Sequence, residues 1–405
     1  YKAYKKKINK VINIKKKFSD IDSFVINKKV ILRVDLNLPL YSGEFSDFTR
    51  LEKIVPTVNY LLDRKAKIIL VSHIGRPDGI KNDDLSLRNL SLKVSTYMKS
   101  EVFFLDENIN NIKKEKIEKL FKTYNIIMLE NLRFFPEEEK NDENFAKKIS
   151  SFADIYVNEC FSVCHRRHSS ITSIPKYLPS FPGKLLEKEI SNLKKLITIS
   201  ENSSSVAVFG GAKVSSKLKV IEYYVKNFSK IIIGGAMANT FLAALEKNVG
   251  SSIYEKSMIK TAQTFLNQFS EKILLPDDAF VMDKSKKIHL KKIDEIKKDE
   301  KIYDIGPQTR MQYYNVILEC SSLLWNGPLG FYEEKPFHEG TNFVIKAVKN
   351  NNNKNFFSVA GGGDTITIIN QANASDYFSF ISTGGGAFLE FIQGKGLPGL
   401  DSLND

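Results

Sequence analysis

Three glycine-rich turns near the C-terminus combine residue types that bind phosphate. Each follows a short apolar run typical of a buried strand, and the two triple-glycine turns precede apparent helices. Glycine lets the backbone approach an anion, and the first turn of a helix offers unpaired N–H groups. We expect a phosphate-binding rim, with tight turns that hold no ligand as the alternative. The turns are Trp325-Asn326-Gly327-Pro328-Leu329-Gly330, Gly361-Gly362-Gly363-Asp364-Thr365 and Ser382-Thr383-Gly384-Gly385-Gly386.

An acidic residue inside one of these turns, Asp364, indicates a magnesium ion that travels with the phosphates. The segment from Gly210 to Lys217 also follows an apolar run and opens a helical pattern. Its glycines permit close packing against a flat or anionic ligand, and Lys217 could reach a phosphate from one turn into the helix. The segment is not a Walker loop, because the required spacing is absent.

The first half of the chain carries cationic side chains where its strands are expected to end. In open parallel sheets, ligands bind beyond the carboxyl ends of the strands. Guanidinium groups form rigid forks that suit carboxylate and phosphate oxygens, so this basin fits a small, multiply anionic metabolite. For any single arginine, a surface salt bridge is the alternative. The side chains expected on this rim are Arg33, Arg50, Arg76, Arg133, Arg166, His73, His165 and His168.

Two other patterns are weaker. Cys160, Cys164, His165 and His168 place two thiols near two imidazoles, which makes zinc a minor alternative to the arginine basin. The run from Gly394 to Gly399 matches G-x-G-x-x-G, but it follows a helical pattern and contains proline. We interpret that match as coincidence.

Composition limits the class of protein. With 405 residues and 42% hydrophobic residues, the chain can build two cores, and three cysteines favour a reducing compartment over a disulfide scaffold. No apolar run reaches the ~18 residues of a membrane helix. The net charge of +13 comes from scattered lysines, except in residues 1–17, which hold eight lysines and no acid. This segment is interpreted as a solvated basic arm, with an organelle-targeting remnant as the alternative.

Strand-like and helical patterns alternate along the chain and predict an α/β fold with mostly parallel sheets. Helices are expected at 50–64, 142–152 and 185–199, the last connecting two domains, and polar loops at 291–301 and 350–353. Strands are expected at 30–37, 67–72, 101–105, 125–130, 154–158, 205–209, 230–234, 272–275, 322–326, 356–360 and 378–382.

An ordered series of segments resembles phosphoglycerate kinases over nearly the whole chain. The segments are Arg33-Val34-Asp35-Leu36-Asn37, 72–77, 129–133, 136–138, 183–189, 210–214, Asp304-Ile305-Gly306-Pro307, 325–330 with Glu333, 361–365, 382–387 and Leu397-Pro398-Gly399.

The resemblance implies reversible phosphoryl transfer between 1,3-bisphosphoglycerate and ADP, giving 3-phosphoglycerate and ATP, with magnesium. It also implies two Rossmann-like domains joined by a hinge helix that closes them over the substrates. Residues 1–185 would bind the triose and residues 186–385 the nucleotide, while the tail 386–405 would pack back towards the first domain. A cytoplasmic monomer with no nucleic-acid or membrane partner is expected, and a plastid or other organelle is the alternative location.

Site residues follow from the same resemblance. Arg50, Lys217, Gly362 and Gly385 would be catalytic, and Asp364 would bind the metal. The substrate-binding set is Asp35, Leu36, Asn37, Arg50, His73, Ile74, Gly75, Arg76, Arg133 and Arg166. The nucleotide-binding set is Gly211, Lys213, Lys217, Gly235, Asn326, Glu333, Gly362, Gly363, Asp364 and Thr365.

Several positions depart from the family pattern. Glu159, Cys160, Ser162, Val163, Cys164 and Arg167 alter the segment around Arg166, and Ser216, Asn239 and Ile302 alter the nucleotide side. These departures bear on nucleotide preference more than on the type of reaction. Two alternatives remain open at this point: a degenerate member that serves as a basic binding or scaffold protein, and an unrelated carboxylate kinase.

Overall fold

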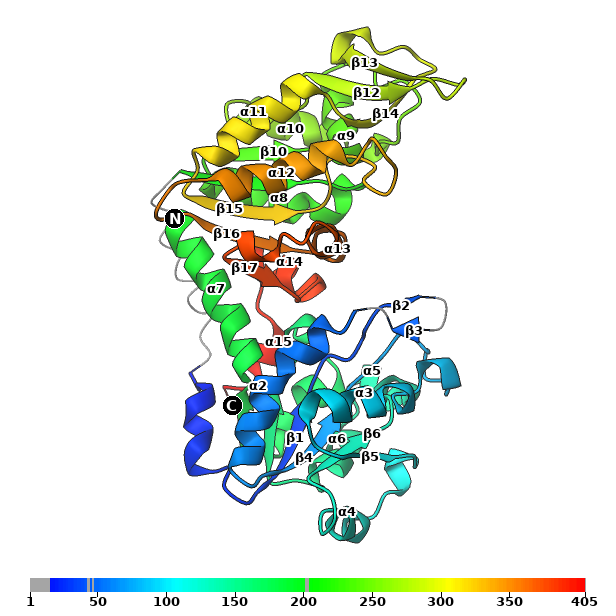
Figure 1. Cartoon of the computed structure of the whole chain (residues 1–405), viewed down its shortest axis with the longest axis vertical. Coiled ribbons are helices and arrows are strands. Elements are labelled where there is room, and N and C mark those ends of the chain that lie inside the picture. The colour runs from blue at the N-terminus through cyan, green and yellow to red at the C-terminus, as the bar shows by residue number, and fades with distance from the viewer. Residues whose placement is uncertain (1–14, 42–43, 46, 201–203, 405) are drawn as a thin grey trace. The chain divides into compact units, whose positions relative to one another are not determined.

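The computed structural model describes residues 15–41, 44, 45, 47–200 and 204–404 (Figure 1). The chain forms two compact units. Unit 1 runs to Ser191 and includes the C-terminal segment from Gly394, and unit 2 is Asn192–Gln393. The division therefore lies at 191/192, inside the connecting helix expected at 185–199 and six residues after the expected end of the first domain, and residues 386–393 fall in unit 2. The basic arm at 1–17 lies almost wholly outside the described residues.

Unit 1 is built on a six-stranded sheet with the order β5-β6-β4-β1-β7-β8. All its strand pairs are parallel, and β1 pairs with both β4 and β7 near the middle of the sheet. The carboxyl ends of the strands therefore meet at one edge, as expected for a ligand-binding rim. The strands are β1 (Lys29–Arg33), β4 (Lys67–Val71), β5 (Val102–Leu105), β6 (Ile126–Leu129), β7 (Ile155–Asn158) and β8 (Ser180–Pro182).

Helices cover this sheet and connect its strands. The longest within the unit, α2 (Thr49–Asp63), buries Leu51, Ile54, Val58 and Leu61, a spacing that keeps one helical face against the sheet. The others are α3 (Arg88–Met98), α4 (Lys114–Leu120), α5 (Pro136–Glu139), α6 (Glu143–Ser150), α15 (Pro398–Asp401) and α7 (Lys184–Ser200), which continues into unit 2. A short hairpin joins β2 (Leu40–Tyr41) and β3 (Glu44–Phe45).

Unit 2 contains a second six-stranded parallel sheet, with the order β11-β10-β9-β15-β16-β17. Val206, Leu323 and Trp325 on one face pack in a core with Tyr313 of α11 and Val344 of α12. The strands are β9 (Ser205–Phe209), β10 (Lys230–Ile233), β11 (Ile273–Leu274), β15 (Ser322–Asn326), β16 (Phe357–Gly361) and β17 (Phe380–Ser382). The helices are α8 (Val214–Asn227), α9 (Gly235–Ala244), α10 (Ile259–Phe269), α11 (Pro307–Leu318), α12 (Glu339–Asn350), α13 (Gly363–Gln371) and α14 (Gly386–Ile392).

The predicted α/β class with two parallel sheets is confirmed, with strand bounds that differ by a few residues. The largest difference is at β1, which ends at Arg33 rather than at residue 37. Beyond Arg33 the chain leaves the ladder, and Asp35 and Asn37 bond side chain to backbone instead, with Asn37 N donating to Asp35 Oδ1 at 2.9 Å. Residues 34–37, expected as the end of the strand, instead form a polar loop at the rim.

The polar loop expected at 291–301 is confirmed for residues 293–300, which lie outside the strands, but not for its two ends. Unit 2 carries an additional antiparallel sheet of β12 (Asp278–Met282), β13 (Ile288–Lys292) and β14 (Lys301–Ile305), so the segment holds the end of one strand and the start of another. Its periodicity is hidden because β13 alternates between exposed and half-buried residues, which leaves no buried apolar face.

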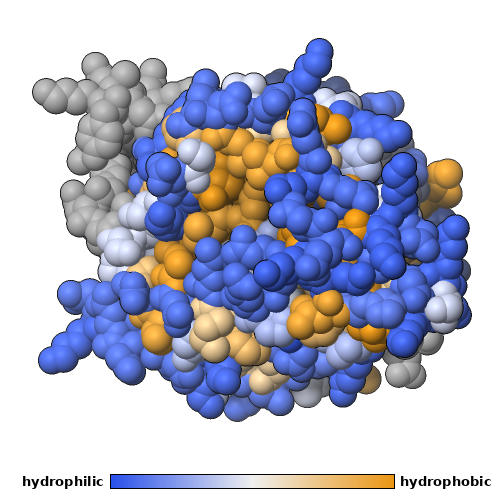
Figure 2. Space-filling view, turned by 90° about the horizontal axis from the view of Figure 1, so that it is seen from above, coloured by the Kyte–Doolittle hydropathy of each residue, from blue (hydrophilic) through white to orange (hydrophobic). Residues whose placement is uncertain are grey.

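Figure 2 shows that hydrophilic residues cover most of one face of the molecule and border a hollow lined by hydrophobic ones. Within the described ranges, the structure contains no helix that is long and apolar enough to cross a membrane.

Candidate functional site

The loops after β1 and β4 are joined by polar contacts at the rim of unit 1. Asp35 Oδ1 accepts a hydrogen bond from Arg50 Nη1 at 3.1 Å, and the same nitrogen donates to the Asn37 carbonyl at 2.7 Å. Asn37 Oδ1 in turn accepts from Gly75 N at 2.9 Å. Leu36 N donates to Ser72 Oγ at 2.9 Å. The rim is therefore held in place by its own hydrogen bonds. Arg50 makes them through Nη1, so its other guanidinium nitrogens remain available to a ligand.

The loop after β6 joins the same network. Arg133 Nη1 donates to the Gly75 carbonyl at 2.7 Å, and Asn131 Nδ2 donates to the Ile74 carbonyl at 2.8 Å. Burial lowers the pKa of Arg133, and the positive charges of Arg33 and Arg166 lower it further. Like charges held this close are relieved by a bound anion, which is the arrangement expected of a phosphate or carboxylate site.

Two of the rim histidines, His73 and His168, have pKa values below the ordinary value for histidine. Burial holds the pKa of His73 well below its ordinary value, and the neighbouring arginines, Arg33 first, add to this effect. Burial also lowers the pKa of His168 to about 3, again assisted by Arg33. Because arginine nitrogens can only donate, the 3.1 Å contact between Arg33 Nη2 and His73 Nδ1 makes that ring nitrogen an acceptor. The arginines of the rim, rather than His73 and His168, therefore supply its positive charge.

Arg33 was expected on this rim, and that prediction is wrong. Its side chain is fully buried, and Nε donates to Ser170 Oγ at 2.9 Å while Nη1 donates to the Val34 carbonyl at 2.5 Å. Ser170 belongs to the buried π-helical turn Ser169–Ser173, so this bond joins the end of β1 to that turn. Buried Glu138 also accepts from Ser170 Oγ, at 2.5 Å. Arg33 is thus a structural residue beneath the rim.

The remaining rim residues differ in exposure. Arg76 and Arg166 are exposed, and Arg166 Nε donates to His165 Nε2 at 3.1 Å. Arg133 acts electrostatically on both His73 and His168, whereas Arg50 acts on His73 and Arg166 on His168, so Arg133 links the other two arginines across the rim. Arg76 lies on the same loop as Gly75.

In unit 2, Lys217 connects the turns after β9 and β15. Its Nζ donates to the Gly210 carbonyl at 2.6 Å and to the Asn326 carbonyl at 3.1 Å. Burial lowers the pKa of Lys217 to about 8, and Asp364 opposes this shift. The ammonium group of Lys217 therefore donates to two neutral carbonyls, and its positive charge is available to a phosphate.

Two glycines of these turns, Gly362 and Gly327, leave no room for a side chain. Gly362 has φ +104°, and a Cβ there would lie 2.6 Å from Asn326 Nδ2. At Gly327, with φ +100°, a Cβ would lie 2.4 Å from the Gly210 carbonyl oxygen. Asn326 Nδ2 donates to the Gly361 carbonyl at 2.6 Å, while its buried Oδ1 has no hydrogen-bond partner among the described residues. Gly385, with φ +50°, opens onto free space.

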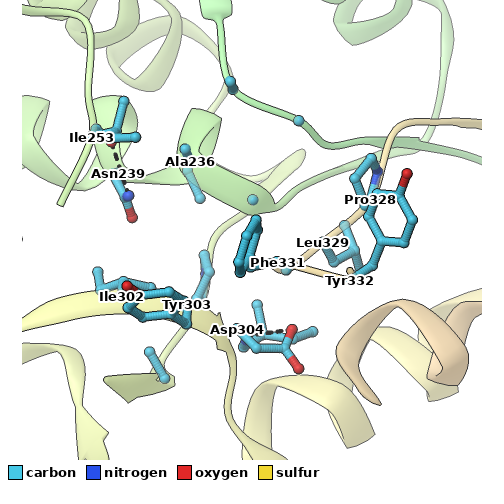
Figure 3. Close-up of a pocket in the computed structure, with 18 of the residues that line it drawn as sticks. Ala236, Asn239, Ile253, Ile302, Tyr303, Asp304, Pro328, Leu329, Phe331 and Tyr332 are labelled. Carbon is cyan, nitrogen blue, oxygen red and sulfur yellow. Dashed lines mark hydrogen bonds between the residues drawn. The ribbon is translucent and has the colours of Figure 1, made fainter. Parts of the chain in front are cut away.

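A cavity of about 370 Å³ lies beside these turns (Figure 3). Of the expected nucleotide-binding residues, Gly211, Gly235, Glu333 and Asp364 line it. Apolar side chains such as Ile253 and Ile302 line much of the rest, which suits a flat base. Lys213, Lys217, Asn326, Gly362, Gly363 and Thr365 lie outside this lining, on or beside the glycine turns.

Thr365 and Asp364 have different environments at the start of α13. Thr365 is fully buried, and its Oγ1 accepts a hydrogen bond from Gly327 N at 2.8 Å. Its hydroxyl therefore stabilises the turn after β15. Asp364 is exposed, and so is Lys213. A single exposed carboxylate beside a phosphate site fits magnesium, which takes most of its ligands from phosphates and water.

The cysteines near the rim are buried thiols. Burial raises the pKa of Cys160 to about 11 and that of Cys164 still further, whereas zinc binds the thiolate. In the part of the chain that the structure describes, no three His, Cys, Asp or Glu side chains are grouped to hold a metal ion.

Sequence reasoning missed three supporting acids. Glu138 lies within the run of acids 137–139, which gives no signal of burial, yet it is completely buried below the rim. Asp304 lines the cavity and pairs with Arg310 Nη2 at 2.7 Å, and burial raises its pKa to about 6. Glu159 was noted only as a departure, but it is completely buried at the start of α7. For Asp304, the match to the motif 304–307 was the available signal.

Comparisons with known proteins agree with this geometry. The family model described as phosphoglycerate kinase matches residues 19–395. A protein named phosphoglycerate kinase from Orientia tsutsugamushi (strain Ikeda) is 39% identical over 390 residues, covering 94% of this chain and 96% of that protein. One from Dictyoglomus turgidum is 40% identical over 390 residues, covering 95% and 97%.

Two solved structures are similar over nearly the whole chain. The phosphoglycerate kinase from Coxiella burnetii superposes with a TM-score of 0.83 at 31% identity, covering 96% of this chain and 98% of that one. The enzyme from Pyrococcus horikoshii OT3 gives 0.82 at 30% identity, with the same coverage. The family match at 19–395 extends over both units, so the chain belongs to the phosphoglycerate kinase family.

Proposed function

We propose that this protein transfers a phosphoryl group reversibly between 1,3-bisphosphoglycerate and ADP, giving 3-phosphoglycerate and ATP. The observation that carries the proposal is the family match over residues 19–395. The geometry supports it independently, because unit 1 offers an arginine rim for an anionic metabolite and unit 2 offers a cavity beside phosphate-binding turns.

On the triose side, we assign anion binding to Arg50, Arg76, Arg133 and Arg166. Asp35 and Asn37 orient Arg50 and the loop at Gly75 through the contacts described above. His73 is held neutral by burial and by the adjacent arginines, so it can orient an oxygen without adding charge. Leu36 and Ile74 are buried and contribute through their backbone and packing.

On the nucleotide side, the glycine backbones of Gly211, Gly235, Gly362, Gly363 and Gly385 approach the ligand, and Glu333 is available to the ribose. Lys217 and the side chain of Asn326 lie where phosphates enter. Lys213 is exposed at the start of α8 and can meet a phosphate from solvent. Asp364 and the phosphates would hold magnesium, which supplies neutralisation of phosphate charge when it is bound.

The chemistry requires alignment and charge neutralisation more than bond activation. An acyl phosphate is a reactive donor, so we assign no covalent enzyme intermediate and no general base. Arg50 and Lys217 are proposed to neutralise the transferring phosphoryl group, and the backbone N–H groups of the glycine turns orient it. Lys217 contacts only backbone carbonyls, so it can move to the substrate without breaking an ion pair. Arg50 holds Asp35 and the Asn37 carbonyl through Nη1, which leaves its other guanidinium N–H groups for the substrate.

The test is a coupled assay of purified protein with 3-phosphoglycerate, Mg-ATP and a dehydrogenase that consumes bisphosphoglycerate. We expect turnover in the wild type and a loss of at least about a hundredfold in kcat for Lys217→Ala. Lys219→Ala, an exposed lysine on the same helix, is the matched control and should retain activity. Wild-type turnover in Lys217→Ala would contradict its assigned role, and no turnover in the wild type would contradict the function.

A monomer is sufficient for this reaction, because residues of one chain form both binding surfaces. Light scattering on the active protein tests this, and activity confined to a larger assembly would contradict it.

A further inference from the structure

One end of the cavity in unit 2 contains a single buried amide among apolar side chains. Asn239 on α9 is only 2% exposed, and its Nδ2 donates to the Ile253 carbonyl at 3.0 Å. Ala236, Ile253 and Ile302 line the cavity around it. Figure 3 shows the amide of Asn239 between Ile253 and the open space above Ile302, with its oxygen on the side away from Ile253.

The orientation of this amide follows from its partner. A backbone carbonyl can only accept, so the Asn239 side chain must present Nδ2 to Ile253. The reversed orientation would place two acceptors 3.0 Å apart. Oδ1 therefore faces the cavity as an acceptor, and no group among the described residues donates to it. An acceptor in apolar surroundings needs a donor from the ligand or from water.

The identity of that donor rests on the proposed function, in which the ligand is ADP or ATP. Gly211 and Asp364 mark the phosphate side of the cavity, and Asn239 lies across it from Pro328 and Tyr332 (Figure 3). The base is thus the part of the nucleotide that reaches Asn239. Adenine has one hydrogen-bond donor group on its ring edges, the 6-amino group.

We propose that Asn239 accepts a hydrogen bond from the 6-amino group of adenine and thereby selects adenine over 6-oxopurines. Hypoxanthine and guanine carry a carbonyl oxygen at the same position, so two acceptors would meet in the same pose. The neighbouring side chains of Ala236, Ile253 and Ile302 are apolar and offer no alternative donor. A site built to hydrogen-bond a substrate group rejects the analogue that lacks it, because its own polar atom is then left unpaired.

The test is calorimetric binding of four Mg-nucleotides to the full chain: ADP, inosine diphosphate, guanosine diphosphate and purine riboside diphosphate, which lacks the 6-substituent. The wild type should bind ADP at least about tenfold more tightly than the other three. In Asn239→Leu the four affinities should lie within about threefold, because the loss falls mainly on ADP. Asn267→Leu, an exposed asparagine on α10, is the matched control and should retain the wild-type preference.

Three outcomes would overturn the inference. These are equal wild-type affinities for ADP and inosine diphosphate, a preference for guanosine diphosphate, and an equal loss for all four nucleotides in Asn239→Leu, which would indicate packing alone. The wild-type series stands by itself if that variant does not fold. Because the readout is binding, a wild type that discriminates without turnover would contradict the proposed function only, and turnover without discrimination would contradict this inference only.

Discussion

The side chain of Glu159 accepts a hydrogen bond from Leu185 N at 3.0 Å, which joins the loop after β7 to the first turn of α7. Leu186 N adds a second bond at 3.2 Å, and Thr57 Oγ1 of α2 donates to the same carboxyl. Gly183 leaves the space that this carboxyl fills, since a Cβ there would lie 1.9 Å from Glu159 Oε2. A buried acid therefore caps the helix that leads out of unit 1.

Replacement of this acid should change the pH dependence of stability. Burial raises the pKa of Glu159 to about 7 from its usual 4.5, although its hydrogen bonds oppose the shift. The folded protein then holds a proton that the unfolded chain releases between these values. The contribution of this group to the free energy of unfolding is complete below about pH 4.5 and is lost as the pH rises through about 7, by roughly 3 kcal/mol.

Glu159→Gln keeps the shape of the side chain and removes this titration. Urea unfolding at pH 5, 6, 7 and 8 should show a smaller fall in stability with rising pH in the variant than in the wild type. Exposed Glu115→Gln is the control and should follow the wild type. Parallel curves for Glu159→Gln and the wild type would contradict the prediction.

Nucleotide affinity should depend on the protonation of Lys217. Burial lowers the pKa of Lys217 to about 8, so the free protein loses this positive charge as the pH rises through that value. A bound phosphate stabilises the charged form, so affinity for ADP should fall from pH 7 to pH 9 and binding near pH 8 should take up protons. Calorimetry in buffers of different ionisation enthalpy measures both. Lys217→Arg should show a flat profile over this range, and a flat wild-type profile would refute the assignment.

Adjacent glycines should differ sharply in their tolerance of alanine. Gly362→Ala places a Cβ against Asn326 Nδ2 at φ +104° and should destabilise unit 2 by about 1–3 kcal/mol. Gly363→Ala meets nothing within 4 Å and begins α13, so its stability should stay within about 0.5 kcal/mol of the wild type. Thermal and urea unfolding of the two variants provide the comparison. Equal stabilities would mean that the turn relaxes more easily than its contacts indicate.

Substitution of Arg33 should lower stability, whereas substitution of Arg76 should weaken substrate binding, although both arginines were expected at the rim. Arg33→Gln removes buried hydrogen bonds to Ser170 and Val34, so it should lose about 2 kcal/mol or more of stability. Arg76 is exposed, so Arg76→Gln should keep its stability and raise KM for 3-phosphoglycerate about tenfold. Unfolding and steady-state kinetics on both variants decide this. A stable Arg33→Gln variant with a raised KM would contradict the structural role and indicate that Arg33 binds the substrate.

Part of the site could be predicted from local pattern alone. The buried parallel strands appear as continuous apolar runs such as Ile68–Ile69–Leu70, because both of their faces are covered by helices. The glycine turns at 361–365 and 382–386 mark where those strands end, because the φ/ψ combinations of Gly362 (104°, 142°) and Gly385 (50°, −116°) favour glycine. These features depend on neighbouring residues, so the sequence determined them.

Other features depended on residues far away in the chain. Arg33 ends β1 and Arg133 follows β6, yet Arg33 is fully buried and bonds Ser170, 137 residues away, whereas Arg133 keeps 8% exposure and bonds the Gly75 carbonyl. The sheet of β12, β13 and β14 has no clear apolar period, so its pairing shows only in three dimensions. The acceptor of Asn239 faces the cavity because Ile253 takes its amide nitrogen. Tertiary structure decided these points, because burial and hydrogen-bond partners are properties of contacts that local sequence does not encode.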